Sequence, residues 1–216
     1  MGFIGKVEMF LIKEKLIVIL VLLSFSCALL VSYVKPNTTL VHKSERVLIV
    51  YLSRTNNTKA IAEIIHDNIG GTLVALELKN PYPENYKATV DQVAKENETG
   101  YLPPLKTKIE NIQQYDLVFV GFPTWGMQLP PPMKSFLTQY NLEGKTIVPF
   151  NTNAGYGIGN SIGTIKELCP NSRILKAFSI KGGIERDGIL FVMEGEKEKQ
   201  ARLEVRAWLQ KLKLLN

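Results

Sequence analysis

From residue 46 onward, short apolar runs alternate with amphipathic stretches. Val47 to Leu52 is a short apolar run rich in β-branched residues, which is typical of a strand buried on both faces of a parallel sheet. Thr58 to Asn68 carries its apolar residues at helical spacing, and Gly70 and Gly71 follow it, so it predicts a helix that ends there. The remaining pattern predicts strands at Thr72–Leu78, Leu117–Phe122, Thr146–Phe150 and Ile174–Ile180, and helices within Pro81–Pro104 and at Met133–Tyr140, Ile162–Leu168 and Glu196–Leu212.

Five predicted strands separated by helices indicate an α/β fold with a doubly wound, open parallel sheet. Right-handed crossovers between parallel strands place helices on both faces of such a sheet. The segment from residue 46 to 213 is long enough for one such domain. Ligands bind beyond the carboxyl ends of the strands, where the strand order reverses. We therefore expect the informative loops after the first, third and fourth strands.

Before this domain, Leu16 to Val34 forms an apolar run of 19 residues without a charge. As a helix it would extend roughly 28 Å, close to the hydrocarbon thickness of a bilayer. We therefore expect a tail at 1–15, a membrane-spanning or signal-anchor helix at 16–34, and a linker at 35–45. A cleaved signal peptide is the main alternative, although no small-x-small cleavage site follows the run. A lipoprotein at Cys27 is less favoured, because the apolar run continues past this cysteine.

The lysines that flank the apolar run are nearly balanced between its two sides, so the positive-inside rule leaves the orientation open. The likeness of the segment to a signal anchor slightly favours an extracytoplasmic domain. The sequence thus predicts a membrane protein with a single N-terminal anchor.

Cysteine and histidine positions indicate neither a disulfide framework nor a metal site. Cys27 and Cys169 lie far apart in the sequence, and His42 and His66 have no neighbouring Cys or His. The three informative loops carry no Ser-His-Asp arrangement, carboxylate pair or cysteine nucleophile, so hydrolysis or covalent catalysis is not indicated. No nucleic-acid recognition motif accompanies the basic charge of the chain.

The loop after the first strand is rich in hydroxyl and amide side chains. It leads directly into a helix, whose N-terminus presents unpaired N–H groups and the positive end of the helix dipole. Hydroxyl groups can add donors, so the combination suits a phosphate. The alternative is simple N-capping by Thr55, Asn56 or Asn57, although one such residue suffices for a cap. The candidate phosphate-binding residues are Ser53, Arg54, Thr55, Asn56, Asn57 and Thr58.

This loop is similar to the phosphate-binding loop of the flavodoxin family, in which a Ser/Thr-x-Thr-Gly-Asn-Thr pattern follows the first strand. The resemblance covers roughly Arg46 to Leu212. It implies a five-stranded sheet of order 2-1-3-4-5, non-covalent FMN as the cofactor, and electron transfer as the function. Asn56 stands where the family usually has glycine. Asparagine tolerates a positive φ better than other non-glycine residues, so the turn is expected to survive.

The loop after the third strand places a tryptophan between a strand end and a proline run. Its candidate cofactor-binding residues are Pro123, Thr124, Trp125 and Gly126. The loop resembles a branch of the flavodoxin family that reads Pro-Thr-Trp-Trp/Gly before several prolines. The resemblance implies that Trp125 stacks on the isoalloxazine ring, and that Gly126 lets a peptide flip and bond to flavin N5 on reduction. The alternative is that Trp125 covers the edge of the sheet.

The loop after the fourth strand combines glycines with one tyrosine. Glycine-rich backbone allows close approach to a flat ligand and offers N–H groups to its pyrimidine oxygens. Tyr156 is the candidate for the second stacking face. A glycine-rich turn alone is weak evidence, but here it follows two loops that match the same family. The candidate residues are Asn151, Thr152, Asn153, Gly155, Tyr156, Gly157 and Gly159.

The net charge of +6 and the pI near 9.2 set this chain apart from soluble flavodoxins, which resemble one another in being acidic. The first 42 residues contribute four Lys and two Glu, which leaves +4 for the rest. A basic domain favours acidic partners or anionic lipid headgroups. The alternative is scattered solubilising charge, since acids interleave with the bases of the last predicted helix.

Three functions follow from these features. The favoured one is a membrane-tethered FMN electron carrier, whose partner is a redox protein or a quinone. The second is an NAD(P)H-dependent FMN quinone reductase. The third is a flavodoxin-shaped interaction module without flavin, which Asn56 and the basic charge leave open. The sequence does not decide between a carrier and a substrate-specific enzyme.

Overall fold

The strands form one parallel sheet in the order β2-β1-β3-β4-β5, with β6 also paired to β4, in a computed structural model that describes residues 46–215. The α/β class and the predicted order 2-1-3-4-5 are therefore confirmed. The strands are β1 (Val47–Tyr51), β2 (Thr72–Ala75), β3 (Leu117–Pro123), β4 (Thr146–Asn153), β5 (Arg173–Ile174) and β6 (Phe178–Lys181).

The fifth strand expected at Ile174–Ile180 is divided in two. β5 pairs with the start of β4, and β6 pairs with its end. The carbonyl of Ile147 in β4 accepts a hydrogen bond from the N–H of Leu175, directly after β5, at 2.9 Å. Two residues later, the backbone of Pro149 is directed toward the same neighbouring segment, but proline has no N–H to continue the ladder. Within the interruption, the carbonyl of Lys176 instead accepts from Trp208 Nε1 at 2.9 Å.

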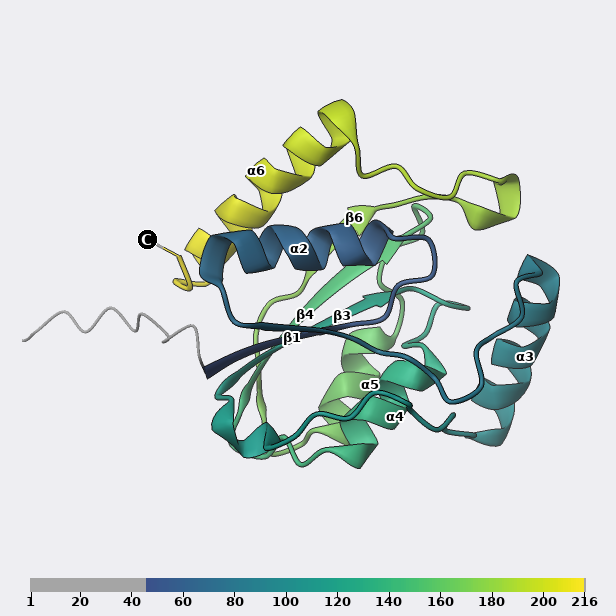
Figure 1. Cartoon of the computed structure of the whole chain (residues 1–216), viewed down its shortest axis with the longest axis horizontal. Helices are drawn as coiled ribbons and strands as arrows, with labels where there is room; N and C mark the ends of the chain where they lie inside the picture. The colour runs from purple at the N-terminus through teal and green to yellow at the C-terminus, as the bar shows by residue number, and fades with distance from the viewer. Residues whose placement is uncertain (1–45, 216) are drawn as a thin grey trace, which may run out of the picture. The chain divides into compact units, whose positions relative to one another are not determined.

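Two pairs of helices cover the two faces of the sheet, as Figure 1 shows. α2 (Asn57–Ile69) and α6 (Gly195–Lys211) pack on one face, and α4 (Pro131–Gln139) and α5 (Ser161–Leu168) pack on the other. Two short 3₁₀ helices, η2 (Ile112–Gln114) and η3 (Glu185–Asp187), lie in the connections. The predicted helices on both faces are thus present in the described residues.

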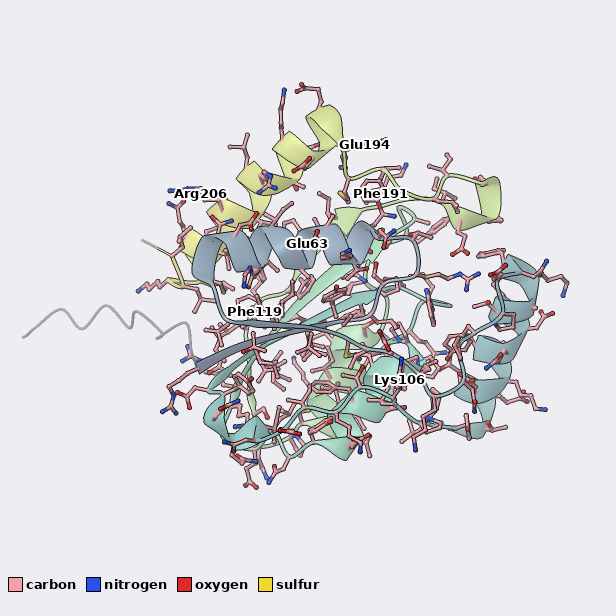
Figure 2. All side chains as sticks on the ribbon, in the orientation of Figure 1. Glu63, Lys106, Phe119, Phe191, Glu194 and Arg206 are labelled. Atoms are coloured by element: carbon pink, nitrogen blue, oxygen red, sulfur yellow. The ribbon has the colours of Figure 1, made fainter. Side chains whose placement is uncertain are left out.

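The alternation of side chains along β1 and β3 builds two apolar layers. Ile49 and Phe119 face α2 and α6, whereas Leu48 and Val118 face α4 and α5. These four side chains are fully buried, which is why the strands read as continuous apolar runs. Figure 2 labels Phe119 in the layer beneath α2, whose Glu63 points to solvent. The apolar core of the domain therefore lies on both faces of the sheet.

The helix expected between the prolines of 81–104 is α3 (Tyr86–Thr99), and it belongs to neither apolar layer. Its N-cap is Asn85, whose side chain accepts from Ala88 N at 3.0 Å. Its buried residues are Thr89, Val93 and Glu96. Figure 1 places α3 beyond the ends toward which the strand arrows point. This helix therefore stands beside the loops that the sequence marks as informative.

The predicted tail, apolar helix 16–34 and linker 35–45 lie outside the described residues. Within residues 46–215, no helix combines the length and apolar composition that crossing a bilayer requires. Cys169 is buried, and burial raises the pKa of its thiol to about 11. At neutral pH this thiol is therefore protonated and poorly reactive.

Candidate functional site

The loop after β1 turns into α2 through a left-handed residue. Asn56 has φ 62° and makes no side-chain cap, so the expectation that asparagine accommodates this position is consistent with the backbone. Within residues 46–215, the backbone N–H groups of Thr55, Asn56, Asn57 and Thr58 have no acceptor. These N–H groups stand at the positive end of the α2 dipole. The simple N-capping alternative does not account for the side chains described next.

The hydroxyl and amide side chains of this loop are held by one another. Asn57 Nδ2 donates to Thr55 Oγ1 at 2.9 Å and to the carbonyl of Leu190 at 2.6 Å. Thr58 Oγ1 lies 2.8 Å from Thr152 Oγ1 in β4, and both side chains are buried. Because Thr55 Oγ1 is an acceptor in the first contact, its own hydroxyl hydrogen is left for another partner. The loop is therefore fixed in place with donors to spare.

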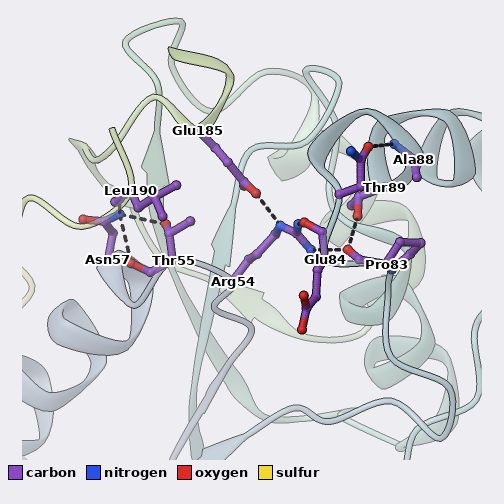
Figure 3. A network of polar contacts seen from close by, with 10 residues as sticks. Arg54, Thr55, Asn57, Pro83, Glu84, Ala88, Thr89, Glu185 and Leu190 are labelled. Atoms are coloured by element: carbon purple, nitrogen blue, oxygen red, sulfur yellow. Dashed lines mark hydrogen bonds and ion pairs between the residues drawn. The ribbon is translucent and has the colours of Figure 1, made fainter. Parts of the chain in front are cut away.

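Arg54, a candidate phosphate-binding residue, has its guanidinium engaged elsewhere (Figure 3). Its Nε donates to Glu185 Oε1 at 2.6 Å. Its two terminal nitrogens donate to the carbonyls of Pro83 and Glu84, at 3.0 and 2.6 Å. Thr89 of α3 donates to the same Pro83 carbonyl. Arg54 thus ties the start of α3 and η3 to the loop after β1.

The loop after β3 ends in a tight turn. Trp125 and Gln128 exchange two backbone hydrogen bonds of 3.3 and 3.0 Å. The two central residues, Gly126 and Met127, have φ 54° and 59°. Two positive φ values in succession are typical of a type I′ turn. The turn presents Trp125 at a fixed position at the edge of the sheet.

Trp125 is half-buried and packs edge-to-face against Tyr82, with ring centroids 5.4 Å apart. The Tyr82 hydroxyl donates to Glu96 Oε2 of α3 at 2.5 Å. Burial, reinforced by this hydrogen bond, raises the pKa of Tyr82. Trp125, in the loop after β3, is therefore packed against the segment that leads into α3. The sequence did not indicate this contact.

β4 continues beyond the predicted end at Phe150, so Asn151, Thr152 and Asn153 lie in the last part of the strand. An amide network joins this strand end to the loops after β3 and β4. Asn151 Nδ2 donates to Thr124 Oγ1 at 2.9 Å, and the Thr124 hydroxyl donates to the Gly157 carbonyl at 2.8 Å. Asn153 Oδ1 accepts from the N–H groups of Gly155 and Gly157, at 2.8 and 3.0 Å. The structure thus brings together the predicted residues of these two loops. Their side chains shape the glycine-rich turn.

Tyr156 stands at the outer side of this turn and is 69% exposed. It lies beside Arg186, whose pKa is raised mainly by Asp187 and further by Tyr156. Tyr156 and Gly126 line the same cavity of ≈ 240 Å³. The tyrosine is therefore available to a ligand between the two loops.

Gly159 allows the turn of residues 125–128 to approach the loop after β4. A Cβ at Gly159 would lie 2.1 Å from the carbonyl oxygen of Met127, which accepts from Asn160 N at 2.9 Å. We expect Gly159→Ala to cost roughly 1–3 kcal/mol more than Gly157→Ala, because it adds overpacking to the strain of a positive φ. Chemical denaturation of both variants measures the difference. Equal losses would show that the close contact does not matter.

Gly157 is a matched control, because its φ is also positive, at 84°, while a Cβ there would meet open space.

A second cavity, of ≈ 120 Å³, lies over the N-terminus of α2. It shares Thr124, Asn153 and Ala154 with the cavity beside Tyr156, so the two are neighbours along one edge of the sheet. Its lining includes residues that sequence reasoning missed, which are Tyr86, Ala154, Gly182, Gly183 and Glu185. The Gly-Gly pair directly after β6 was a usable signal, because it forms a fourth loop at the same edge.

The lining of these cavities fits the FMN that the sequence resemblance implies. The backbone N–H groups of Thr55 to Thr58, which have no acceptor in the described part of the chain, and the Thr55 hydroxyl can bind the phosphate. A flat ring can lie along the loops of Trp125 and Tyr156. Gly182 packs so closely that an added Cβ would lie 3.3 Å from the Asn57 Cβ. The described residues hold no group of three His, Cys, Asp or Glu side chains arranged for a metal ion.

Comparison with known proteins gives a consistent result. A family model described as Flavodoxin matches residues 46–194. The chain is similar to a protein assigned as a flavoprotein from Bacteroides eggerthii DSM 20697, with 28% identity and a TM-score of 0.61, over 77% of this chain and 96% of that chain. A comparison with curated proteins gave no match.

The chain is also similar in fold to a flavoprotein of Lactobacillus acidophilus NCFM that was solved in complex with FMN. The identity is 20% and the TM-score 0.57, over 62% of this chain and 93% of that chain. At this level of identity the likeness shows the fold alone.

Proposed function

This chain belongs to the flavodoxin family, and we propose that it binds one non-covalent FMN at the carboxyl edge of its sheet and transfers electrons. The observation that carries the proposal is the α2 N-terminus, where N–H groups that have no acceptor among residues 46–215 meet the fixed hydroxyls of Thr55 and Thr58. The FMN complex of the Lactobacillus acidophilus flavoprotein supports the choice of cofactor.

The residues divide the binding between the two ends of the cofactor. The N–H groups of Thr55 to Thr58 and the Thr55 hydroxyl would hold the phosphate. Trp125 and Tyr156 would flank the ring, and the N–H groups near Gly157 would approach its pyrimidine edge. When bound, FMN supplies one- and two-electron chemistry, while the protein sets its potential.

The turn at Gly126 and Met127 can change its hydrogen bonding at low cost. Inverting the peptide between these residues would convert the type I′ turn into a type II′ turn, which requires glycine at its first central position. Met127 would then leave the left-handed region, a backbone conformation that is unfavourable for a residue with a Cβ. Both backbone forms are therefore accessible to Gly126, and the turn can present either a carbonyl or an N–H group to the cofactor.

Reversible reduction tests the electron-transfer part of the proposal. We expect the FMN-loaded chain to lose its visible absorbance on anaerobic addition of dithionite and to regain it on addition of ferricyanide, with FMN still bound. Release of FMN on reduction, or failure to regain the spectrum, would contradict a role as an electron carrier.

We also propose that residues 16–34 tether this domain to a membrane, on the basis of their 19 uncharged residues. The full chain should stay in the membrane fraction after an alkaline carbonate wash, and a chain that lacks residues 1–40 should not. Release of the full chain by carbonate would contradict the tether and leave FMN binding untouched.

A further inference from the structure

A cavity of ≈ 450 Å³ lies between α3 and the turn of residues 125–128, and we name it the α3 cavity. One wall is apolar and consists of Val90, Val93 and Ala94 of α3 together with Trp125. Val90, Val93 and Ala94 recur at helical spacing on one side of α3. A protein that only passes electrons to another protein does not require a partly open cavity of this size, with one apolar wall, beside its proposed cofactor site.

The polar side of the α3 cavity presents two amide groups whose orientation is fixed by a lysine. Lys134 Nζ donates to Asn97 Oδ1 at 2.9 Å and to Gln128 Oε1 at 3.4 Å. An ammonium group can only donate, so both amide oxygens face Lys134. Within the described residues, neither amide NH₂ group has an acceptor. Since both residues line the cavity, these NH₂ groups can donate to a molecule inside it.

The charges around the α3 cavity disfavour an anionic occupant. Arg54, a cation in the lining, is committed to Glu185 and to two backbone carbonyls. Glu98 adds a negative charge at the exposed side of α3. An anion placed here would meet these acids, and Lys134, which lies outside the lining, already donates to the amide oxygens of Asn97 and Gln128. A neutral ligand with hydrogen-bond acceptors and a flat apolar body fits the cavity better.

We propose that the α3 cavity binds a neutral planar molecule of the quinone class, whose carbonyl oxygens accept from the NH₂ groups of Asn97 and Gln128. Trp125 lines both this cavity and the cavity over α2, so the bound molecule lies next to the proposed cofactor site. A quinone becomes a hydroquinone by gaining two electrons and two protons. The electrons would come from the reduced flavin and the protons from water, and this role rests on the proposed function.

The test uses menadione and, as a ligand of similar shape without carbonyls, 2-methylnaphthalene. Both are titrated into the full chain labelled with ¹⁵N at Asn and Gln side chains, with and without FMN. We expect menadione to shift the NH₂ signals of Asn97 and Gln128 and to bind at least ~10-fold more tightly than 2-methylnaphthalene, since the hydrogen bonds favour the carbonyl ligand.

The double variant Asn97→Leu/Gln128→Leu should bind menadione ~10-fold more weakly and 2-methylnaphthalene about as well as the unmodified chain. Gln200→Leu is the matched control, because it removes an exposed side-chain amide on α6, and it should change neither affinity. Ala94→Phe places an aromatic ring at the cavity wall while keeping both amide residues, and it should weaken both ligands, which keeps the test valid if the double variant does not fold.

Equal binding of menadione by the double variant, or no binding by the unmodified chain, would overturn the proposal. Displacement of FMN by menadione would also overturn it, because the cavity would then belong to the cofactor. FMN binding is measured separately through flavin fluorescence. Menadione binding without FMN binding would contradict the proposed function alone, and FMN binding without menadione binding would contradict this inference alone.

Discussion

Thr55→Glu is expected to weaken FMN binding by at least ~100-fold while leaving riboflavin binding within a few-fold. The new carboxylate would stand beside the phosphate at the N-terminus of α2. Two unit charges about 5 Å apart repel by about 3 kcal/mol at an effective dielectric constant near 20, and about 2.7 kcal/mol corresponds to a factor of 100. Riboflavin carries no phosphate, so it escapes this repulsion. Titration of each ligand, followed by flavin fluorescence, measures both affinities.

Thr55→Gln provides the control for size, because it adds similar bulk without charge. It should reduce FMN binding far less than Thr55→Glu does. If Thr55→Glu weakened riboflavin and FMN equally, the loop would act through the overall shape of the site and the phosphate would lie elsewhere.

Trp125→Leu is expected to weaken FMN and riboflavin to the same extent, by about 10- to 100-fold. Stacking of a base on an aromatic side chain is worth about 1–3 kcal/mol, and the flavin ring offers a comparable flat surface. The ring is common to both ligands, so the phosphate does not alter this loss. Trp125→Phe keeps an aromatic face and should lose much less. The same titrations measure all four affinities.

Thermal unfolding of these Trp125 variants separates stacking from stability, because Trp125 also packs against Tyr82. A folded Trp125→Leu chain that binds both flavins with unchanged affinity would place the ring away from this residue.

The positions of the strands and of most helices could be predicted because they depend on local patterns. The β-branched run of β1 reflects burial within the sheet, and the helical spacing of α2 reflects burial of one face of the helix. The division of the fifth strand was missed because its cause, Pro149, lies in a neighbouring strand. The pairing between strands determines where such a proline interrupts the ladder, and the pattern of one strand does not contain it.

The candidate site shows the same division between local and distant information. The loops after β1, β3 and β4 could be found because each follows its own strand directly. The role of Arg54 could not, because its partners Glu185 and Pro83 are far away in the sequence. The amides of Asn97 and Gln128 were missed for the same reason, since Lys134 brings them together from separate elements.

Direct titration of the flavin-free full chain with FMN tests the central claim. Quenching of flavin fluorescence should saturate at one FMN per chain, and riboflavin should bind at least ~10-fold more weakly, because it lacks the charge-assisted hydrogen bonds of the phosphate. A folded chain that shows no saturable binding of FMN would contradict the account.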